Sequence, residues 1–183
     1  KEIFVSYSEN RGNRKSSTSV AKATLKDNDL NFRNIFRAEP PINSGYHFGS
    51  RLVIKDNYLF ITAGERGKGM IAQDATKHPG SIIRINTDGS IPSDNPKFED
   101  KKNWLPEIYQ IGVRNPQGMA LSPFNNEIYL TNHGAKGGEA TNVVLFLNQT
   151  TNTLKGAQKS PEKQDEEYRV WYVGATRSSQ NLY

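Results

Sequence analysis

Residues Tyr109 to Asn142 read Y-Q-I-G-V-R-N-P-Q-G-M-A-L-S-P-F-N-N-E-I-Y-L-T-N-H-G-A-K-G-G-E-A-T-N. Within this stretch, two short apolar runs, Met119–Leu121 and Ile128–Thr131, flank the turn-forming residues Ser122–Asn126. Short β-prone runs on either side of such a turn predict a β-hairpin. The polar motifs R-N-P-Q-G and H-G-A-K-G-G lie before and after the hairpin, so we expect their side chains to meet at one end of a sheet. Loops held there by a rigid scaffold often form binding sites.

Upstream, further short β-prone runs are separated by turn signals. The predicted strands are Ile3–Tyr7, Ser19–Leu25, Asn31–Arg37, Leu52–Ile54, Tyr58–Ala63 and Ser81–Asn86. This pattern predicts an all-β fold of antiparallel sheets, either a propeller or a sandwich. Two segments repeat the order strand, turn, strand ending in Thr and polar loop, which favours a propeller of consecutive four-stranded sheets.

Composition limits the classes of function. The chain has 183 residues, of which 34% are hydrophobic, enough for the core of one domain with a small appendage. It has no cysteine, which excludes disulfides, thiol nucleophiles and cysteine metal sites. The net charge of +5 is spread along the chain and does not by itself indicate a nucleic-acid partner. No apolar run is long enough for a transmembrane helix, and no signal-peptide pattern opens the chain at Lys1.

Several motifs in a fixed order resemble a known family. They are Tyr46–Leu52, Thr62–Gly67, Ala72–Asp74, His78–Gly80, Arg84–Pro96 and Arg114–Gly118, followed by the H-G-A-K-G-G word. Together they resemble the soluble pyrroloquinoline quinone (PQQ)-dependent sugar dehydrogenases, also called glucose/sorbosone dehydrogenases. The resemblance implies a six-bladed β-propeller, of which residues 1–139 would form only a part, two to three blades.

The same resemblance implies roles for individual residues. His47 would be the general base that activates the C1 hydroxyl of an aldose sugar for hydride transfer to PQQ. The resemblance further implies PQQ contacts from Arg114 and Asn115, backbone and carboxylate ligands for Ca²⁺ at Gly134, Ala135 and Glu139, and contacts lining the substrate entrance from Glu65, Gln73 and Asp74.

Each of these residues also has a purely structural interpretation. A lone loop histidine is usually a surface residue, and R-N-P-Q-G can be a turn capped by its own side chains. Glu65, Gln73 and Asp74 can equally be turn residues and surface carboxylates. His78, beside Pro79-Gly80, is expected to be structural.

The C-terminal part changes character. Residues 166–177, E-E-Y-R-V-W-Y-V-G-A-T-R, resemble the last motif of UvrD/Rep-type superfamily 1 helicases, and His133–Glu139 fits an upstream helicase word as well. We therefore expect a chimeric chain, with a dehydrogenase-like part over residues 1–139 and a short α/β, helicase-like tail over residues 140–183. No G-x-x-x-x-G-K-[ST] phosphate loop is present in the sequence, so we expect no ATP-driven unwinding by this chain.

Two functional hypotheses follow. The first is a fragment of a PQQ-dependent aldose dehydrogenase with weak or no activity alone, periplasmic or secreted by resemblance, whose open blades associate into a homo-oligomer that completes the propeller. The second is a non-catalytic β-rich domain with a helicase remnant. Ca²⁺-dependent binding of PQQ distinguishes them.

Overall fold

The computed structural model describes residues 1–25, 30–96, 103–132, 140–143 and 178–182. Within these ranges the chain is almost entirely β-structure, and its one helical element is the short 3₁₀ helix η1 (Gly69–Gln73). No helix in the described ranges is long and apolar enough to cross a membrane. The prediction of an all-β fold is therefore confirmed for the described part of the chain.

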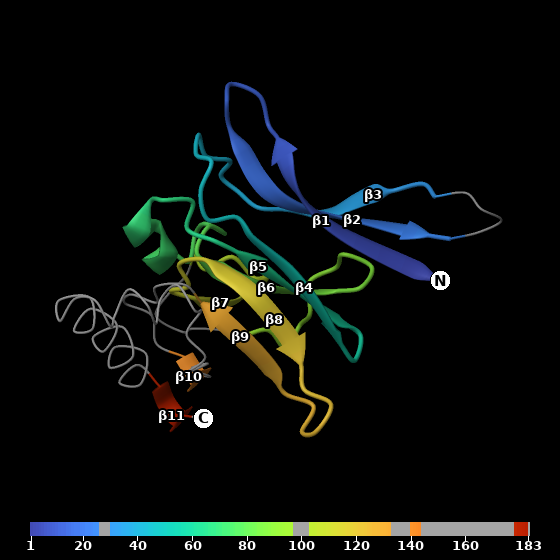
Figure 1. Ribbon diagram of the computed structural model, residues 1–183, viewed down its shortest axis with the longest axis vertical. Helices are drawn as coiled ribbons and strands as arrows, with labels where there is room; N and C mark the ends of the chain where they lie inside the picture. The colour runs from blue at the N-terminus through green and yellow to red at the C-terminus, as the bar shows by residue number, and fades with distance from the viewer. Residues whose placement is uncertain (26–29, 97–102, 133–139, 144–177, 183) are drawn as a thin grey trace, which may run out of the picture.

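The strands form successive sheets, which Figure 1 shows as layers (Figure 1). The first contains β1 (Glu2–Asn10), β2 (Ser16–Thr24) and β3 (Arg33–Arg37). The second contains β4 (Gly49–Lys55), β5 (Tyr58–Ala63), β6 (Ser81–Asn86) and β7 (Ile108–Ile111). The third contains β8 (Pro116–Leu121) and β9 (Ile128–Asn132), and a parallel pair joins β10 (Ala140–Val143) to β11 (Ser178–Leu182).

Both hairpins predicted from turn signals are present. Strands β8 and β9 pair antiparallel with Leu121 opposite Ile128, and β4 and β5 pair with Lys55 opposite Tyr58. The second turn contains Asp56 at a φ of 56°, a left-handed conformation that aspartate tolerates better than most residues. The turn chemistry thus fixes the register of both hairpins.

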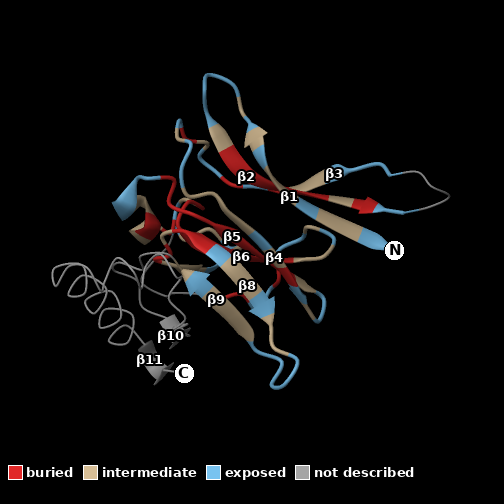
Figure 2. Ribbon diagram, in the orientation of Figure 1, coloured by how far each residue is buried: buried red, intermediate tan, exposed pale blue. Residues whose placement is uncertain are grey.

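Apolar side chains hold the sheets face to face. One buried cluster joins the first two sheets through Val20, Phe36, Leu59, Ile61, Ile83 and Ile85. A second joins the second and third sheets through Val53, Phe60, Ile82 and Val113, with Met119 and Leu130 packed against it. Figure 2 shows that buried residues concentrate in β5 and β6, the central strands of the second sheet, and in β2, the central strand of the first sheet (Figure 2). Consecutive antiparallel sheets packed in this way form a partial β-propeller, as predicted.

Among the described residues, the prediction of consecutive four-stranded sheets is confirmed for the second sheet, and the other sheets have two or three described strands. The loop that connects β3 to β4 (residues 38–48) contains His47 and is called the His47 loop. In the second sheet, the edge strand β4 starts at this loop and its neighbour β5 ends beside it. In the first sheet, β1 and β3 are both antiparallel to β2, so the edge strand β1 ends on the side of the His47 loop, as β5 does, and no described strand lies beside β1 as β4 lies beside β5.

Candidate functional site

Three connecting segments meet at the end of the sheets to which β5 runs. His47 lies between β3 and β4, Glu65 directly follows β5, and Arg114 and Asn115 lie between β7 and β8. The backbone N–H of Glu65 donates to the carbonyl of Arg114 at 2.8 Å. The structure thus brings His47 and Arg114, which are 67 positions apart in the sequence, to one place through the Glu65 segment.

Glu65 is the centre of this cluster. Its side chain is only 3% exposed, and its Oε1 bonds the Nδ1 atom of His47 and lies 3.7 Å from the Nε atom of Arg114. Its Oε2 accepts the backbone N–H of Gly69 at 2.6 Å. Each carboxylate oxygen therefore has a partner, and the buried charge is compensated by donors from three segments.

The contact with Glu65 fixes the chemistry of the His47 ring. A carboxylate accepts hydrogen bonds, so a neutral His47 carries its proton on Nδ1 and keeps the lone pair on Nε2. No described residue bonds Nε2. A ring held in this tautomer can accept a proton at Nε2, while the carboxylate stabilises the imidazolium that results.

Gly64 allows the loops to approach this closely. A Cβ atom at Gly64 would lie 2.1 Å from the carbonyl oxygen of His47 and 3.1 Å from that of Arg114. Both contacts are with backbone and cannot be relieved by a side-chain rotation. A glycine is therefore required where the His47 loop crosses the end of β5.

Arg114 and Asn115 differ in exposure. The side chain of Arg114 is 41% exposed, so its guanidinium can reach a ligand, whereas Asn115 is buried. Their backbone N–H groups both donate to Oδ1 of Asn132, at 3.1 and 3.0 Å. A side chain from β9, and not their own, caps this turn, which removes the simplest structural interpretation of R-N-P-Q-G.

Three buried polar atoms have no hydrogen-bond partner among the described residues. They are Oδ1 of Asn115, an acceptor, Nε2 of Gln73, a donor, and the hydroxyl oxygen of Ser81. Buried polar groups are nearly always bonded, so such atoms mark places where a ligand or water is expected. The exposed guanidinium of Arg114 and Nε2 of Gln73 are donors, which suit the carboxylate and carbonyl oxygens of a polar planar group such as PQQ, whereas Oδ1 of Asn115 accepts and needs an N–H or O–H from a ligand or from water.

Asp74 is engaged in a local turn. Its Oδ1 accepts the backbone N–H and the hydroxyl of Thr76 at 3.0 and 2.6 Å, and its Oδ2 lies 2.6 Å from Nζ of Lys77. The hydrogen bond from Lys77, followed by that from Thr76, lowers the pKa of Asp74 to about 2. These contacts favour the structural interpretation of Asp74, and its role towards a substrate stays a prediction.

The residues predicted to bind Ca²⁺, Gly134, Ala135 and Glu139, lie outside the described residues. Among the residues that the structure does describe, no group of three or more His, Asp or Glu side chains could hold a metal ion. The calcium site therefore remains a prediction from sequence.

Sequence reasoning left the function of Glu65 open and assigned none to Arg66. A carboxylate and a guanidinium between glycines are typical of an exposed loop, yet both residues are buried here. The available signal was position: Gly64-Glu65-Arg66 directly follows a β-run that ends in Thr62-Ala63, at the end of the sheet where His47 was expected.

Comparison with known proteins gives this geometry a family context. The model of the Glucose / Sorbosone dehydrogenase family matches residues 1–148, and so continues past residue 139, the predicted boundary. Aldose sugar dehydrogenase YliI of Escherichia coli (strain K12) is 41% identical in an alignment of 148 positions that covers 78% of this chain and 39% of that protein. Quinoprotein glucose dehydrogenase B of Acinetobacter calcoaceticus is 30% identical over 119 residues, covering 54% of this chain and 24% of that protein.

Solved structures agree with the sequence comparison. The soluble aldose sugar dehydrogenase of Escherichia coli in the apo form superposes with a TM-score of 0.68 and 40% identity, over 75% of this chain and 41% of that chain. The PQQ-bound aldose sugar dehydrogenase of Streptomyces coelicolor, at 20% identity and a TM-score of 0.57, shares the fold. The chain spans about two fifths of the length of the E. coli relative. On the family match over residues 1–148, this chain belongs to the glucose/sorbosone dehydrogenase family.

Proposed function

We propose that this chain carries the proton-accepting part of a PQQ-dependent aldose dehydrogenase site. The observation that supports the proposal best is the shared oxygen of Glu65, which bonds Nδ1 of His47 and lies 3.7 Å from Nε of Arg114. In the proposal, the base His47 and the guanidinium of Arg114 share one oxygen of a buried carboxylate. Family membership and the quinoprotein name of one relative supply the substrate class and the cofactor of the proposal.

His47 is the base in this mechanism. Its Nε2 accepts the proton of the C1 hydroxyl of the aldose, and Glu65 holds the ring through Nδ1 so that Nε2 faces the reacting group. Arg114 binds oxygen atoms of the cofactor through its exposed guanidinium. Asn115 offers its unpartnered Oδ1 as an acceptor, and Gln73 offers its unpartnered Nε2 as a donor. When bound, PQQ supplies the acceptor for the hydride that leaves C1 as the hydroxyl is deprotonated.

A transplant tests this function despite the short length of the chain. Residues 1–148 would replace the aligned segment of the E. coli aldose sugar dehydrogenase, which supplies the remainder of the propeller. We expect this hybrid to reduce dye with PQQ, Ca²⁺ and an aldose, and the isolated chain to show little or no turnover because proximity is lost when half of the contacts are absent. A folded hybrid with neither PQQ binding nor turnover would support the alternative, a non-catalytic β-rich domain.

Completion of the propeller by a second copy is a further part of the proposal. The outer edges of β1 and β9 pair with no described strand, and unpaired edges are templates for association. Sedimentation over a concentration series should show a species larger than a monomer. Val5→Lys, which places a charge on the half-exposed face of β1, should shift the species towards the monomer. A strictly monomeric wild-type chain at high concentration would contradict association.

Two other expectations remain predictions. Family resemblance favours a periplasmic or secreted location, which fractionation of the expressing cell would test. The helicase-like character of residues 140–183 stays a prediction from the sequence motifs, and we expect no ATP hydrolysis from the purified chain.

A further inference from the structure

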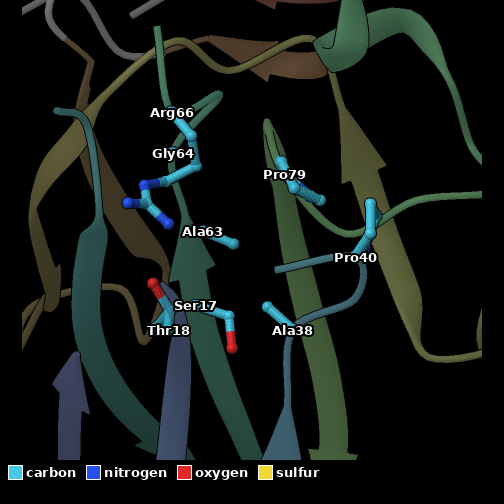
Figure 3. Close-up of a pocket in the computed structure, with 8 residues that line it drawn as sticks. All are labelled: Ser17, Thr18, Ala38, Pro40, Ala63, Gly64, Arg66 and Pro79. Atoms are coloured by element: carbon cyan, nitrogen blue, oxygen red, sulfur yellow. The ribbon is translucent and has the colours of Figure 1, made fainter. Parts of the chain in front are cut away.

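Arg66 is a buried cation beside the site. It lies in the turn after β5 at a φ of 57°, and it is 3% exposed. Figure 3 shows its side chain on the wall of a cavity of about 10 Å³ that Ser17, Thr18 and Ala38 also line (Figure 3). The cavity is roughly large enough for one water molecule and is not a substrate site. The guanidinium of Arg66 instead donates hydrogen bonds to the backbone around His47 and to Ser16.

The guanidinium contacts residues that precede and follow His47 in its loop. Its Nε donates to the carbonyl of Tyr46 at 2.8 Å, and its Nη2 donates to the carbonyl of Ser44. Its Cζ atom lies 3.6 Å from the centre of the Phe48 ring. Three of the residues around His47 are thus held by one planar group, which cannot rotate its donors independently.

The guanidinium also donates to Ser16 in β2, which connects it to the first sheet. Nη1 donates to the carbonyl of Ser16 at 2.7 Å, and Nη2 lies 3.1 Å from the Ser16 hydroxyl. Within the described residues no carboxylate forms an ion pair with Arg66, so carbonyl dipoles and the face of Phe48 are its compensation. Burial lowers the pKa of Arg66, which reflects the cost of this placement.

The His47 backbone needs such a constraint. Its φ is 51°, a left-handed conformation that a non-glycine residue keeps only where the surrounding structure over-determines it. The Phe48 carbonyl is fixed as well, by the Gly64 N–H at 3.2 Å and the Thr18 hydroxyl at 2.7 Å. The side chain of Arg66 does not bond the His47 ring, so any effect of Arg66 on the ring passes through the backbone of the loop.

We propose that Arg66 is a positioning residue that holds the backbone around His47 so that its ring meets Glu65 through Nδ1. The inference deepens the proposed function, because it concerns the presentation of the base. It makes a claim about the ring that a merely structural tie between β2 and the loop does not make. Loss of Arg66 changes which ring nitrogen carries the proton.

Nuclear magnetic resonance of the ¹⁵N-histidine-labelled chain measures that directly. The chain has three histidines, and at about pH 8 an ordinary imidazole is neutral, so its tautomer can be read from long-range ¹H–¹⁵N spectra. We expect His47 as the Nδ1–H form. His78, whose Nδ1 accepts the Glu39 N–H, should be the Nε2–H form and serves as the internal control.

Arg66→Met should shift His47 to the Nε2–H form that predominates in exposed histidine and leave His78 unchanged. Ser16→Ala, which removes only the hydroxyl contact on the far face, should leave both rings unchanged. A His47 ring that stays Nδ1–H in folded Arg66→Met overturns the proposal. Should Arg66→Met lose the His78 pattern and hence the fold, Arg66→Lys decides by the same criterion, because its ammonium cannot reproduce the planar fork.

The hybrid enzyme separates this proposal from the proposed function. There Arg66→Met should lower kcat by about ten- to a hundredfold, as a small misplacement of a catalytic group does, with PQQ affinity retained. An inactive wild-type hybrid together with a shifted His47 tautomer in the chain would refute the function and keep the positioning role. An active hybrid that is indifferent to Arg66→Met, with an unchanged tautomer, would refute the positioning role alone.

Discussion

Two histidine–glutamate pairs use the same side chains in opposite ways. In the first, His47 meets Glu65 through Nδ1, with the histidine side chain 19% exposed and the glutamate buried. In the second, His78 is 5% exposed and meets Glu107 through Nε2 at 2.9 Å, while its Nδ1 accepts the Glu39 N–H at 2.8 Å. Both ring nitrogens of His78 are therefore occupied, whereas the Nε2 of His47 has no described partner.

This difference separates a candidate base from a structural tie. A histidine with both nitrogens bonded cannot accept a further proton without losing a bond. His78 instead connects the segment after β3 to the segment before β7, and its ring packs edge-on against Phe36 with centroids 5.1 Å apart. These contacts favour the predicted structural role of His78. The value of a His–Glu pair as catalytic evidence thus depends on the second nitrogen.

The largest expected effect comes from breaking the first pair. In the hybrid enzyme, His47→Ala should lower the rate of dye reduction by about 10²–10⁴-fold, the usual contribution of general base catalysis, with PQQ binding largely kept. Arg114→Ala should weaken both binding and turnover. His78→Ala is the matched control and should act on stability, with kcat per folded molecule preserved. Turnover unaffected by His47→Ala would remove the proposed mechanism.

Gly64→Ala tests whether the first pair depends on close loop approach. The added Cβ would lie 2.1 Å from the His47 carbonyl oxygen, so the loop must move, at about 1–3 kcal/mol of unfolding free energy, as overpacking typically costs. Urea denaturation measures this loss. Gly45→Ala is the control in the same loop, because nothing lies within 4 Å of its added Cβ, and it should change stability by less than about 0.5 kcal/mol. Equal effects of the two substitutions would show that the close approach is not limiting.

The sequence was sufficient for the elements that carry local signals. The Lys55-Asp56-Asn57 and Ser122–Asn126 turns, flanked by β-prone runs, predicted both hairpins correctly. Strand β7 was missed, because four residues between a long loop and Gly112 carry no periodicity, and its pairing with β6 is decided by tertiary packing.

The site was predictable in part, for a different reason. The word around His47 identified it as a candidate base, but the buried state of Glu65 and Arg66 depends on three segments that are distant in sequence. Nothing in G-E-R-G distinguishes a buried, fully bonded pair of charges from a solvated loop. Only the crossing of the His47 loop over Gly64 makes that distinction.

Glu107→Gln removes the negative charge from the second pair, keeps an oxygen that can accept the His78 hydrogen bond, and tests the pH dependence of the pair. The hydrogen bond from His78 is the main cause that lowers the pKa of Glu107 below its usual value. A lowered folded-state pKa means stability that is present above the ordinary pKa of about 4.5 and is lost as pH falls through the folded value. Urea midpoints of the wild type should therefore decline as pH falls below about 4.5, and more steeply than those of Glu107→Gln, which costs about 1–2 kcal/mol at neutral pH. Parallel pH profiles would contradict the pairing.

The smallest effect is expected at Asp74, in the turn that leads to His78. Asp74→Asn removes the ion pair with Lys77 and keeps an oxygen for the Thr76 N–H, so the turn should persist. The pair is partly exposed and worth only about 0.2–1 kcal/mol after solvent screening. Because the pKa of Asp74 is lowered to about 2, this contribution is present above about pH 4 and disappears towards pH 2. Urea denaturation at pH 7, with and without about 1 M salt, measures this contribution, since salt should shrink the stability difference between wild type and variant.

In the hybrid enzyme, Asp74→Asn should leave the KM for the aldose unchanged if Asp74 is only a turn residue, and should raise the KM if Asp74 binds the sugar. A raised KM in a variant of near wild-type stability would therefore support the substrate-binding role that the resemblance of the sequence motifs implied for Asp74.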